Sequence, residues 1–143
     1  MALRIDILTL FPEMFGPVLG TSIPKRAAEK GLVEYHLTNI RDYATDAHKS
    51  VDDRPFGGGP GMVMLCQTLF DAVETVEKLD PRPATRILLS PQGRLMDQEL
   101  VQELARKERL LLVAGHYEGF DERIIEGLRP TELSIGDYVL SAR

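Results

Sequence analysis

Two short segments of this chain consist of apolar residues only, so each predicts a strand that is apolar on both faces. Leu110–Ala114 and Ile87–Leu89 contain only apolar residues, while Leu3–Leu10 and Val33–Leu37 alternate in the manner of strands. A strand that is apolar on both faces must be covered on both sides, and helices supply that cover in parallel sheets. These segments therefore predict an α/β domain with a mainly parallel sheet flanked by helices.

Helical patterns separate the predicted strands. Apolar residues at helical spacing, or caps and breakers, predict helices over four segments, which are Ser22–Lys30, Gln67–Lys78, Met96–Leu104 and Asp121–Gly127. Ser22 is the predicted N-cap of the first helix and Asp97 that of the third. A further weak strand is predicted near Thr131. The regular alternation of strand and helix supports the α/β prediction.

Length and composition narrow the class of protein further. A chain of 143 residues predicts one domain. Its single cysteine, Cys66, excludes a disulfide framework and a cysteine-based zinc cluster, and we expect it to pack as a buried apolar residue. We expect no structural metal, and the apolar runs are too short to cross a bilayer. With no signal peptide in the pattern, we expect a cytoplasmic protein.

The charge distribution argues against binding nucleic acid by bulk electrostatics. The formal net charge is -5, whereas such binding requires a basic surface. Two basic groups stand out, which are Lys25, Arg26 and Lys30, and then Arg82, Arg86 and Arg94. Each group is expected to be solvated surface unless the side chains converge in space.

Three glycine-containing segments follow predicted strands. They are Ser90–Arg94, Gly115–Gly119 and Ser134–Leu140. In open α/β sheets, ligands bind outside the carboxyl ends of the strands, where glycine allows backbone to approach a ligand. One such segment would be an ordinary turn, but three at successive strand ends predict a binding cleft.

A fourth glycine-rich segment matches no phosphate-binding motif. Phe56–Met62 lacks the Gly-Lys-Ser/Thr of a P-loop, and Met62 stands where a dinucleotide-binding motif requires glycine. So much backbone freedom costs folding entropy. We interpret the segment as a cover over the cleft.

Five segments together are similar to the bacterial tRNA (guanine-N1)-methyltransferase family. They occur in the family's order and spacing, and they are Leu10–Phe15, Val51–Met62, Leu89–Arg94, Tyr117–Arg123 and Ser134–Leu140. The resemblance covers residue 3 to about residue 140. It implies a methyltransferase of the SPOUT class, whose α/β domain contains a trefoil knot, and we expect this chain to be truncated before the knot is completed.

The resemblance also implies a reaction and its partners. The family transfers a methyl group from S-adenosylmethionine to N1 of the guanosine at position 37 of tRNA, next to the anticodon, and acts as a homodimer. An alternative is a non-catalytic remnant that binds S-adenosylmethionine or only dimerises.

Carried over by position, the resemblance implies two sets of site residues. The cofactor would be bound by Leu88, Ser90, Pro91, Gln92, Gly93, Gly115, Tyr117, Glu118, Ile135, Gly136, Asp137, Tyr138, Val139 and Leu140. The target guanosine would meet Asp52, Asp53, Arg54, Gly59 and Pro60.

The chain departs from the family pattern at two places. His116 stands where the family usually has arginine, and Ser141–Arg143 stands where the family continues with Gly-Gly-Glu and, further on, a helical tRNA-binding domain. The resemblance places the family's catalytic aspartate and an accompanying arginine beyond residue 143. Of the carboxylates near the predicted cleft, Asp52, Asp53 and Glu118, none matches that base, so we expect little or no methyl transfer by residues 1–143 alone.

Overall fold

A parallel sheet of five strands forms the centre of the structure. The computed structural model describes residues 2–44, 52–53, 63–64, 66–114 and 122–136. The five strands are β1 (Leu3–Thr9), β2 (Val33–Asn39), β5 (Ala84–Leu95), β6 (Arg109–Ala114) and β7 (Thr131–Ser134). Their order is β2-β1-β6-β5-β7, and each neighbouring pair is parallel. The predicted α/β class with a mainly parallel sheet is confirmed.

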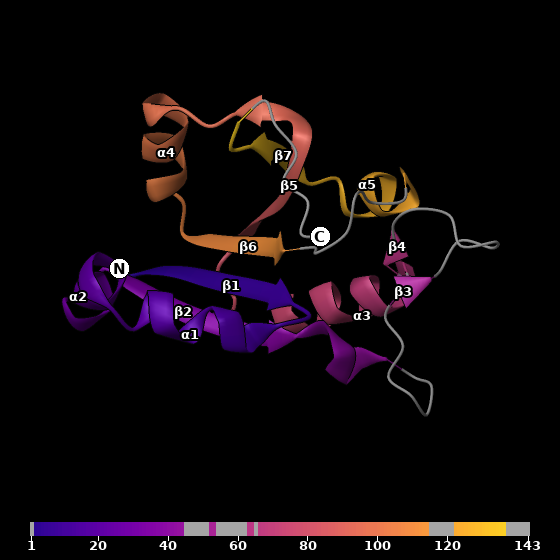
Figure 1. The fold of residues 1–143 in the computed structure, drawn as a ribbon, viewed down its shortest axis with the longest axis horizontal. Coiled ribbons are helices and arrows are strands. Elements are labelled where there is room, and N and C mark those ends of the chain that lie inside the picture. The colour runs from indigo at the N-terminus through magenta and orange to yellow at the C-terminus, as the bar shows by residue number, and fades with distance from the viewer. Residues whose placement is uncertain (1, 45–51, 54–62, 65, 115–121, 137–143) are drawn as a thin grey trace, which may run out of the picture.

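Helices connect the strands (Figure 1). The α-helices are α1 (Gly16–Leu19), α2 (Ser22–Glu29), α3 (Cys66–Glu77), α4 (Gln98–Ala105) and α5 (Glu122–Leu128). Two short 3-10 helices, η1 (Pro12–Met14) and η2 (Ile40–Tyr43), follow β1 and β2. A separate antiparallel pair is formed by β3 (Asp52–Asp53) and β4 (Val63–Met64). The helices predicted from periodicity are confirmed within one or two residues at each end, a margin that is usual at helix termini.

Strand alternation divides the core into two clusters, one on each face of the sheet. On one face, buried side chains such as Leu8 and Leu111 pack with Leu69 and Val73 of α3 and with Ile124 of α5. The other face carries a smaller cluster, which contains Ile87, Leu100, Leu110 and Leu133. Leu100 belongs to α4, so helices cover both faces as the apolar strands required.

The start of α2 differs from the prediction. The N-cap is Thr21, not Ser22, and its hydroxyl donates to the Pro17 carbonyl of α1 instead of accepting from α2. Ser22 lies inside the first turn with a φ of 54°. The short connection between α1 and α2 therefore decides the cap, and a sequence pattern read for α2 alone could not include that contact.

A network of buried charges lies at the amino edge of the sheet, where the strands begin. The carboxylate of Asp6 in β1 accepts from Arg4 Nε at 3.0 Å and from Arg109 Nε at 2.8 Å. Arg109 is fully buried, and it also donates to the carbonyls of Val76, Glu77 and Asp80 at the end of α3. An arginine beside a helix C-terminus satisfies carbonyls that lack a partner within the helix. This network joins two neighbouring strands to α3.

Two of the basic residues noted in the sequence extend this network. Arg82 donates to both carboxylate oxygens of Asp80, at 2.9 and 2.8 Å, and to Glu34 of β2. Arg86 donates to both carboxylate oxygens of Glu77 and to the Leu128 carbonyl at the end of α5. These side chains therefore hold elements together and do not form an exposed basic surface.

Two further points concern membrane-spanning helices and the predicted knot. Within the described residues, no helix is long and apolar enough to cross a membrane. The predicted trefoil knot, and the expected truncation of the chain before the knot is completed, are not tested by the described residues and stay predictions.

Candidate functional site

The carboxyl edge of the sheet brings several predicted site segments to one side of the molecule. Asn39 of β2, Thr9 of β1 and Ala114 of β6 are in register across three neighbouring strands, and Ala114 is followed by the predicted loop at Gly115. β5 and β7 complete the same edge. The carboxyl ends of parallel strands meet at one edge of the sheet, and ligands of open α/β sheets bind at that edge.

Ser90–Gly93 forms a bulge inside β5. Leu89 and Arg94 both pair with Leu133 of β7, so the four residues between them leave the ladder. The prediction of a loop that follows a short strand Ile87–Leu89 was wrong in this respect, because β5 resumes after the bulge and runs to Leu95. A bulge releases backbone N–H and C=O groups from strand pairing, and one of those released here, the Gln92 N–H, donates to the Ser90 hydroxyl at 3.2 Å.

Gly93 is required by the packing of this bulge. A Cβ at this position would lie 2.5 Å from the carbonyl carbon of Glu132 and 2.6 Å from the nitrogen of Leu133, both in the backbone of β7. Backbone cannot move aside as a flexible side chain can. The glycine therefore lets the bulge lie directly against β7, a role that does not depend on a ligand.

The turn after β7 lies beside the bulge and is held by Ser134. The Ser134 hydroxyl donates to the Gly136 carbonyl at 2.8 Å and accepts from the Gly136 N–H at 3.2 Å. The Ser134 carbonyl accepts from the N–H of Met96, which follows β5, at 2.8 Å. The ends of β5 and β7 are thus linked by backbone hydrogen bonds around the bulge.

Apolar side chains are exposed on this edge. Leu89 is 45% exposed and Ile135 is 63% exposed, whereas Leu88 is buried in the core cluster that contains α3. Exposed apolar side chains beside free backbone groups are the usual lining of a nucleoside-binding cleft. The buried side chain of Leu88 can support this surface only from behind.

The structure places part of each predicted residue set. Of the predicted cofactor residues, Ser90–Gly93, Ile135 and Gly136 lie together on the carboxyl edge through the pairing of β5 with β7. Leu88 is described but buried beneath this edge. The remaining seven lie outside the described residues, and they are Gly115, Tyr117, Glu118, Asp137, Tyr138, Val139 and Leu140.

The predicted guanosine-binding set is described only in its backbone. Asp52 and Asp53 form β3 and pair with Met64 and Val63. Arg54, Gly59 and Pro60, and with them most of the glycine-rich segment, lie outside the described residues.

The carboxyl edge also carries an arginine that the sequence analysis did not single out. The guanidinium of Arg41 in η2 lies over the ring of Phe11, 5.8 Å from its centroid. Phe11 follows β1, and its N–H donates to the Thr9 hydroxyl at 3.1 Å. No spacing pattern connects positions 11 and 41, so only the pairing of β1 with β2 could reveal this contact.

Shifted pKa values mark the opposite edge of the sheet. The hydrogen bonds from the side chain and the backbone of Arg82 hold the pKa of Asp80 well below its usual value. Arg82 and then His36 lower the pKa of Glu34, and the Glu77 carboxylate raises the pKa of Arg86. These shifts follow from ion pairs that support the fold, and none of them involves a predicted site residue.

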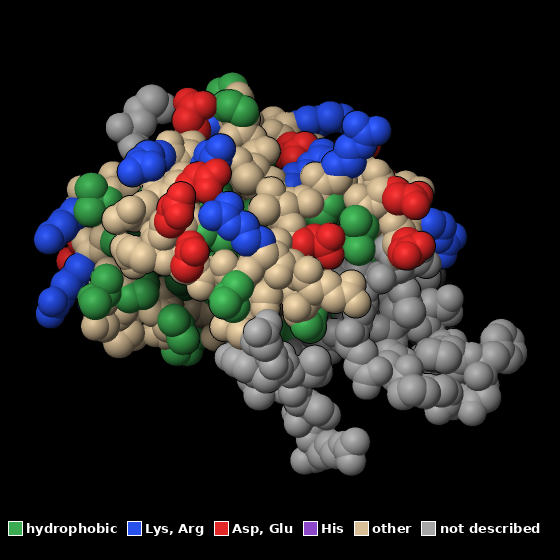
Figure 2. All heavy atoms as spheres, turned by 90° about the horizontal axis from the view of Figure 1, so that it is seen from above, with side chains coloured by type: hydrophobic (Ala, Val, Ile, Leu, Met, Phe, Trp, Pro, Cys, Tyr) green, Lys and Arg blue, Asp and Glu red, His purple; other side chains and the backbone are tan. Residues whose placement is uncertain are grey.

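Surface charge is mixed. Figure 2 shows acidic and basic side chains interspersed over the face seen from above, in keeping with the net charge of -5. Lys25 lies 3.9 Å from Glu29, and Arg94 lies 3.5 Å from Glu103. Each of these two cations therefore has an acidic side chain within ion-pair distance.

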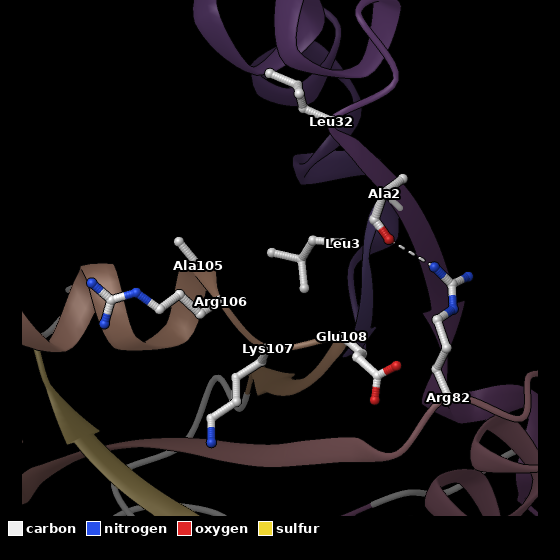
Figure 3. Close-up of a pocket in the computed structure, with 8 residues that line it drawn as sticks. All are labelled: Ala2, Leu3, Leu32, Arg82, Ala105, Arg106, Lys107 and Glu108. Atoms are coloured by element: carbon white, nitrogen blue, oxygen red, sulfur yellow. Dashed lines mark hydrogen bonds between the residues drawn. The ribbon is translucent and has the colours of Figure 1, made fainter.

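A cavity of about 470 Å³ lies at the amino edge, away from the predicted cleft (Figure 3). The residues that line it lie at or just before the first residues of β1, β2, β5 and β6, and they are Ala2, Leu3, Leu32, Arg82, Ala105, Arg106, Lys107 and Glu108. Arg82 donates from this cavity to the Ala2 carbonyl at 2.8 Å. The cavity contains none of the predicted site residues.

The remaining candidates for chemistry are few. Within the described part of the chain, no group of three or more His, Cys, Asp or Glu side chains could hold a metal ion. Cys66 is only partly buried, at the first turn of α3, and packs against the core. This differs from the predicted full burial because the helix begins at the cysteine, near the surface.

Known proteins resemble this chain over nearly all of its length. The family described as tRNA (Guanine-1)-methyltransferase TrmD matches residues 3–143. Curated relatives named tRNA (guanine-N(1)-)-methyltransferase include one from Dehalococcoides mccartyi strain BAV1, 55% identical over 139 residues, which are 97% of this chain and 56% of the relative. A relative from Ruminiclostridium cellulolyticum is 53% identical over 140 residues, or 97% of this chain and 60% of the relative. One from Bacillus cereus strain AH820 is 54% identical over 139 residues, or 97% and 57%. The chain thus spans somewhat more than half the length of these relatives.

Proposed function

This chain belongs to the tRNA (guanine-1)-methyltransferase family, and we propose that it binds S-adenosylmethionine at the carboxyl edge of its sheet. The protein that contains it would transfer a methyl group to N1 of the guanosine at position 37 of tRNA. The observation that carries the proposal is the match of the family over residues 3–143. The arrangement of β5 and β7 supports it.

The carboxyl edge fits the chemistry of the cofactor. An adenosine needs backbone donors and acceptors for the base and apolar walls for its faces. The bulge at Ser90–Gly93 has backbone outside the strand ladder, and Leu89 and Ile135 are exposed beside it. The hydrogen bonds of Ser134 to Gly136 hold the second wall in place.

The reaction requires mainly that the protein position the cofactor and the guanine relative to each other. S-adenosylmethionine supplies an activated methyl group, and the protein must hold the guanine N1 in line with it. N1 carries a proton, so a general base near it would assist the transfer. We propose that the described residues bind and orient the cofactor, while this base belongs to another part of the protein, as the resemblance implies.

Partners and location follow from the same proposal. The proposed substrate is tRNA, which implies a cytoplasmic enzyme, and the resemblance implies a homodimer with a trefoil knot. Single-chain behaviour in sedimentation equilibrium at micromolar concentration would contradict the dimer without affecting the proposal for the cofactor.

Calorimetry tests the cofactor site. Titration with S-adenosylmethionine and S-adenosylhomocysteine should show saturable binding, and ATP should show none. Ile135→Asp should weaken binding about tenfold or more, because it places a charge against the proposed adenosine surface. Ile23→Asp is the matched control, since Ile23 is 74% exposed on α2, away from the carboxyl edge.

Two results would contradict the proposal. The first is the absence of binding by the unaltered chain, which would favour a non-catalytic role. The second is equal affinity in the Ile135→Asp variant, which would place the cofactor elsewhere. For the whole protein, methyl transfer to a tRNA with guanosine at position 37, but not to one with adenosine there, would test the substrate.

A further inference from the structure

Five arginines among the described residues are buried or half-buried, and one of them has an unusual partner. Arg4, Arg82, Arg86 and Arg109 each pair with a carboxylate. Arg41 instead lies over the ring of Phe11, and within the described ranges it makes no ion pair. A half-buried charge without a counter-charge is costly, so its retention calls for an explanation.

The position of Arg41 is closely determined. Ile40, immediately before it, is fully buried in the core. The Asn39 side chain accepts from the Arg41 N–H at 3.0 Å and so caps η2. Phe11 packs against the same core. The guanidinium is therefore held by backbone and ring before any ligand arrives.

Within the described residues, the guanidinium of Arg41 makes no side-chain hydrogen bond, so its N–H donors are available there. Phe11 offers the cation the face of an aromatic ring, which accepts no conventional hydrogen bond, and the planar fork of N–H donors matches the oxygens of a phosphate. The nearest acidic residues in sequence to Arg41 and Phe11, Asp42 and Glu13, are exposed, and the described structure shows no ion pair between either of them and Arg41. Among the residues that the structure describes, the positive charge of Arg41 is therefore not paired with a carboxylate.

Arg41 also lies on the edge where the reaction is proposed. It follows Asn39 by two residues, and Asn39, Thr9 and Ala114 are in register across β2, β1 and β6. Neighbouring strands lie about 4.8 Å apart, so β2 is roughly 10 Å from β6. A nucleotide bound near the end of β6 would extend over this distance.

We propose that Arg41, held on Phe11, binds a backbone phosphate of the substrate RNA and positions it beside the cofactor. This inference rests on the proposed function. It also explains how an acidic chain can bind RNA. With a net charge of -5, the chain must bind RNA through specific cations and not through a broad basic surface.

Binding of an anticodon stem–loop RNA with the target guanosine, measured over a range of salt concentrations, tests the proposal. In the presence of S-adenosylhomocysteine, Arg41→Ala should weaken binding about tenfold and reduce the slope of log K against log salt by about one. Arg41→Lys should restore the slope but only part of the affinity, since lysine keeps the charge without the planar fork. Arg106→Ala removes the same charge from the amino edge and should change neither value.

Separate measurements distinguish the ways in which the proposals can fail. The variants should bind S-adenosylhomocysteine and unfold as the unaltered chain does. If only Arg41→Ala loses stability, the RNA affinity and salt slope of Arg41→Lys test the phosphate contact instead. An unchanged salt slope in Arg41→Ala would overturn the phosphate contact alone. The RNA titration uses the whole protein, as the methyl-transfer test does. Equal RNA affinity of that protein and its Arg41→Ala variant would overturn the role of Arg41 even where calorimetry supports the cofactor site, and failure to bind the cofactor would overturn the proposed function itself.

Discussion

At the scale of single residues, Gly93 shows how a position in a candidate ligand loop can be set by packing. The sequence places it among the predicted cofactor residues, and the structure shows it against the Glu132–Leu133 peptide of β7. The two roles are compatible, because the close approach of two backbones also shapes the bulge that we propose as part of the cofactor site.

Substitution of Gly93 therefore has a defined expected result. Gly93→Ala should lower the free energy of unfolding by about 1–3 kcal/mol, since the added Cβ meets backbone and forces β5 and β7 apart. It should also weaken cofactor binding, because the bulge must shift. Urea denaturation and calorimetry measure the two effects. The control is Gly16→Ala, where a Cβ would meet nothing within 4 Å, and equal stability of both variants would show that the contact does not matter.

At the scale of elements, α4 shows how a short helix covers the smaller core cluster. It has eight residues and buries Leu100 against Ile87, Leu110 and Leu133. Helices this short are marginal in isolation, so the cap and the packing must stabilise it. The predicted cap is confirmed, since Asp97 accepts from the Leu100 N–H at 2.8 Å.

Removal of this cap is expected to destabilise the domain modestly. Asp97→Ala should lower the free energy of unfolding by about 1 kcal/mol, the usual value for a lost N-cap. Asp97→Asn should retain most of the stability, because the amide oxygen can still accept from the Leu100 N–H. Thermal denaturation of the two variants compares them directly, and an equal loss in both would indicate that the negative charge is what matters and not the hydrogen bond.

At the scale of the whole molecule, the two edges of the sheet have different roles. The amino edge is held by ion pairs among β1, β2, α3, β5 and β6, and the carboxyl edge carries the candidate site. Rigid elements fixed at one edge allow turns and bulges at the other to be positioned accurately. The buried charges of the amino edge thus support the site without belonging to it.

Arg109 is the centre of that support. Arg109→Leu should lower the free energy of unfolding by about 3–5 kcal/mol, because the Glu77, Asp80 and Val76 carbonyls lose the Arg109 donor, with only Val76 keeping the Leu79 N–H, and Asp6 is left with Arg4 alone. Urea denaturation should show this loss, while Arg106→Leu at an exposed position should change stability by no more than about 0.5 kcal/mol. A small effect of Arg109→Leu would mean that the network is dispensable.

The amino edge also predicts how stability depends on pH. The lowered pKa values of Asp80 and Glu34 mean that the unfolded chain takes up protons in acid before the folded chain does. Stability from these carboxylates is fully present above their ordinary pKa of about 4 and is lost as the pH falls towards their folded values. Urea denaturation from pH 6 to pH 2.5 should show this loss. Asp80→Asn and Arg82→Gln should each flatten the curve, and a slope unchanged in both would exclude the pair as its source.

The sequence by itself determined the fold class, the order of the elements and the edge at which the candidate site lies. These follow from local patterns, since apolar runs such as Leu110–Ala114 must be covered on both faces and parallel strands end on one side. Only the tertiary structure decided that Ser90–Gly93 is a bulge inside β5, that Arg109 is a buried support and that Arg41 lies on Phe11. Each of these depends on contacts between segments far apart in the chain, and such contacts exist only once the strands have paired.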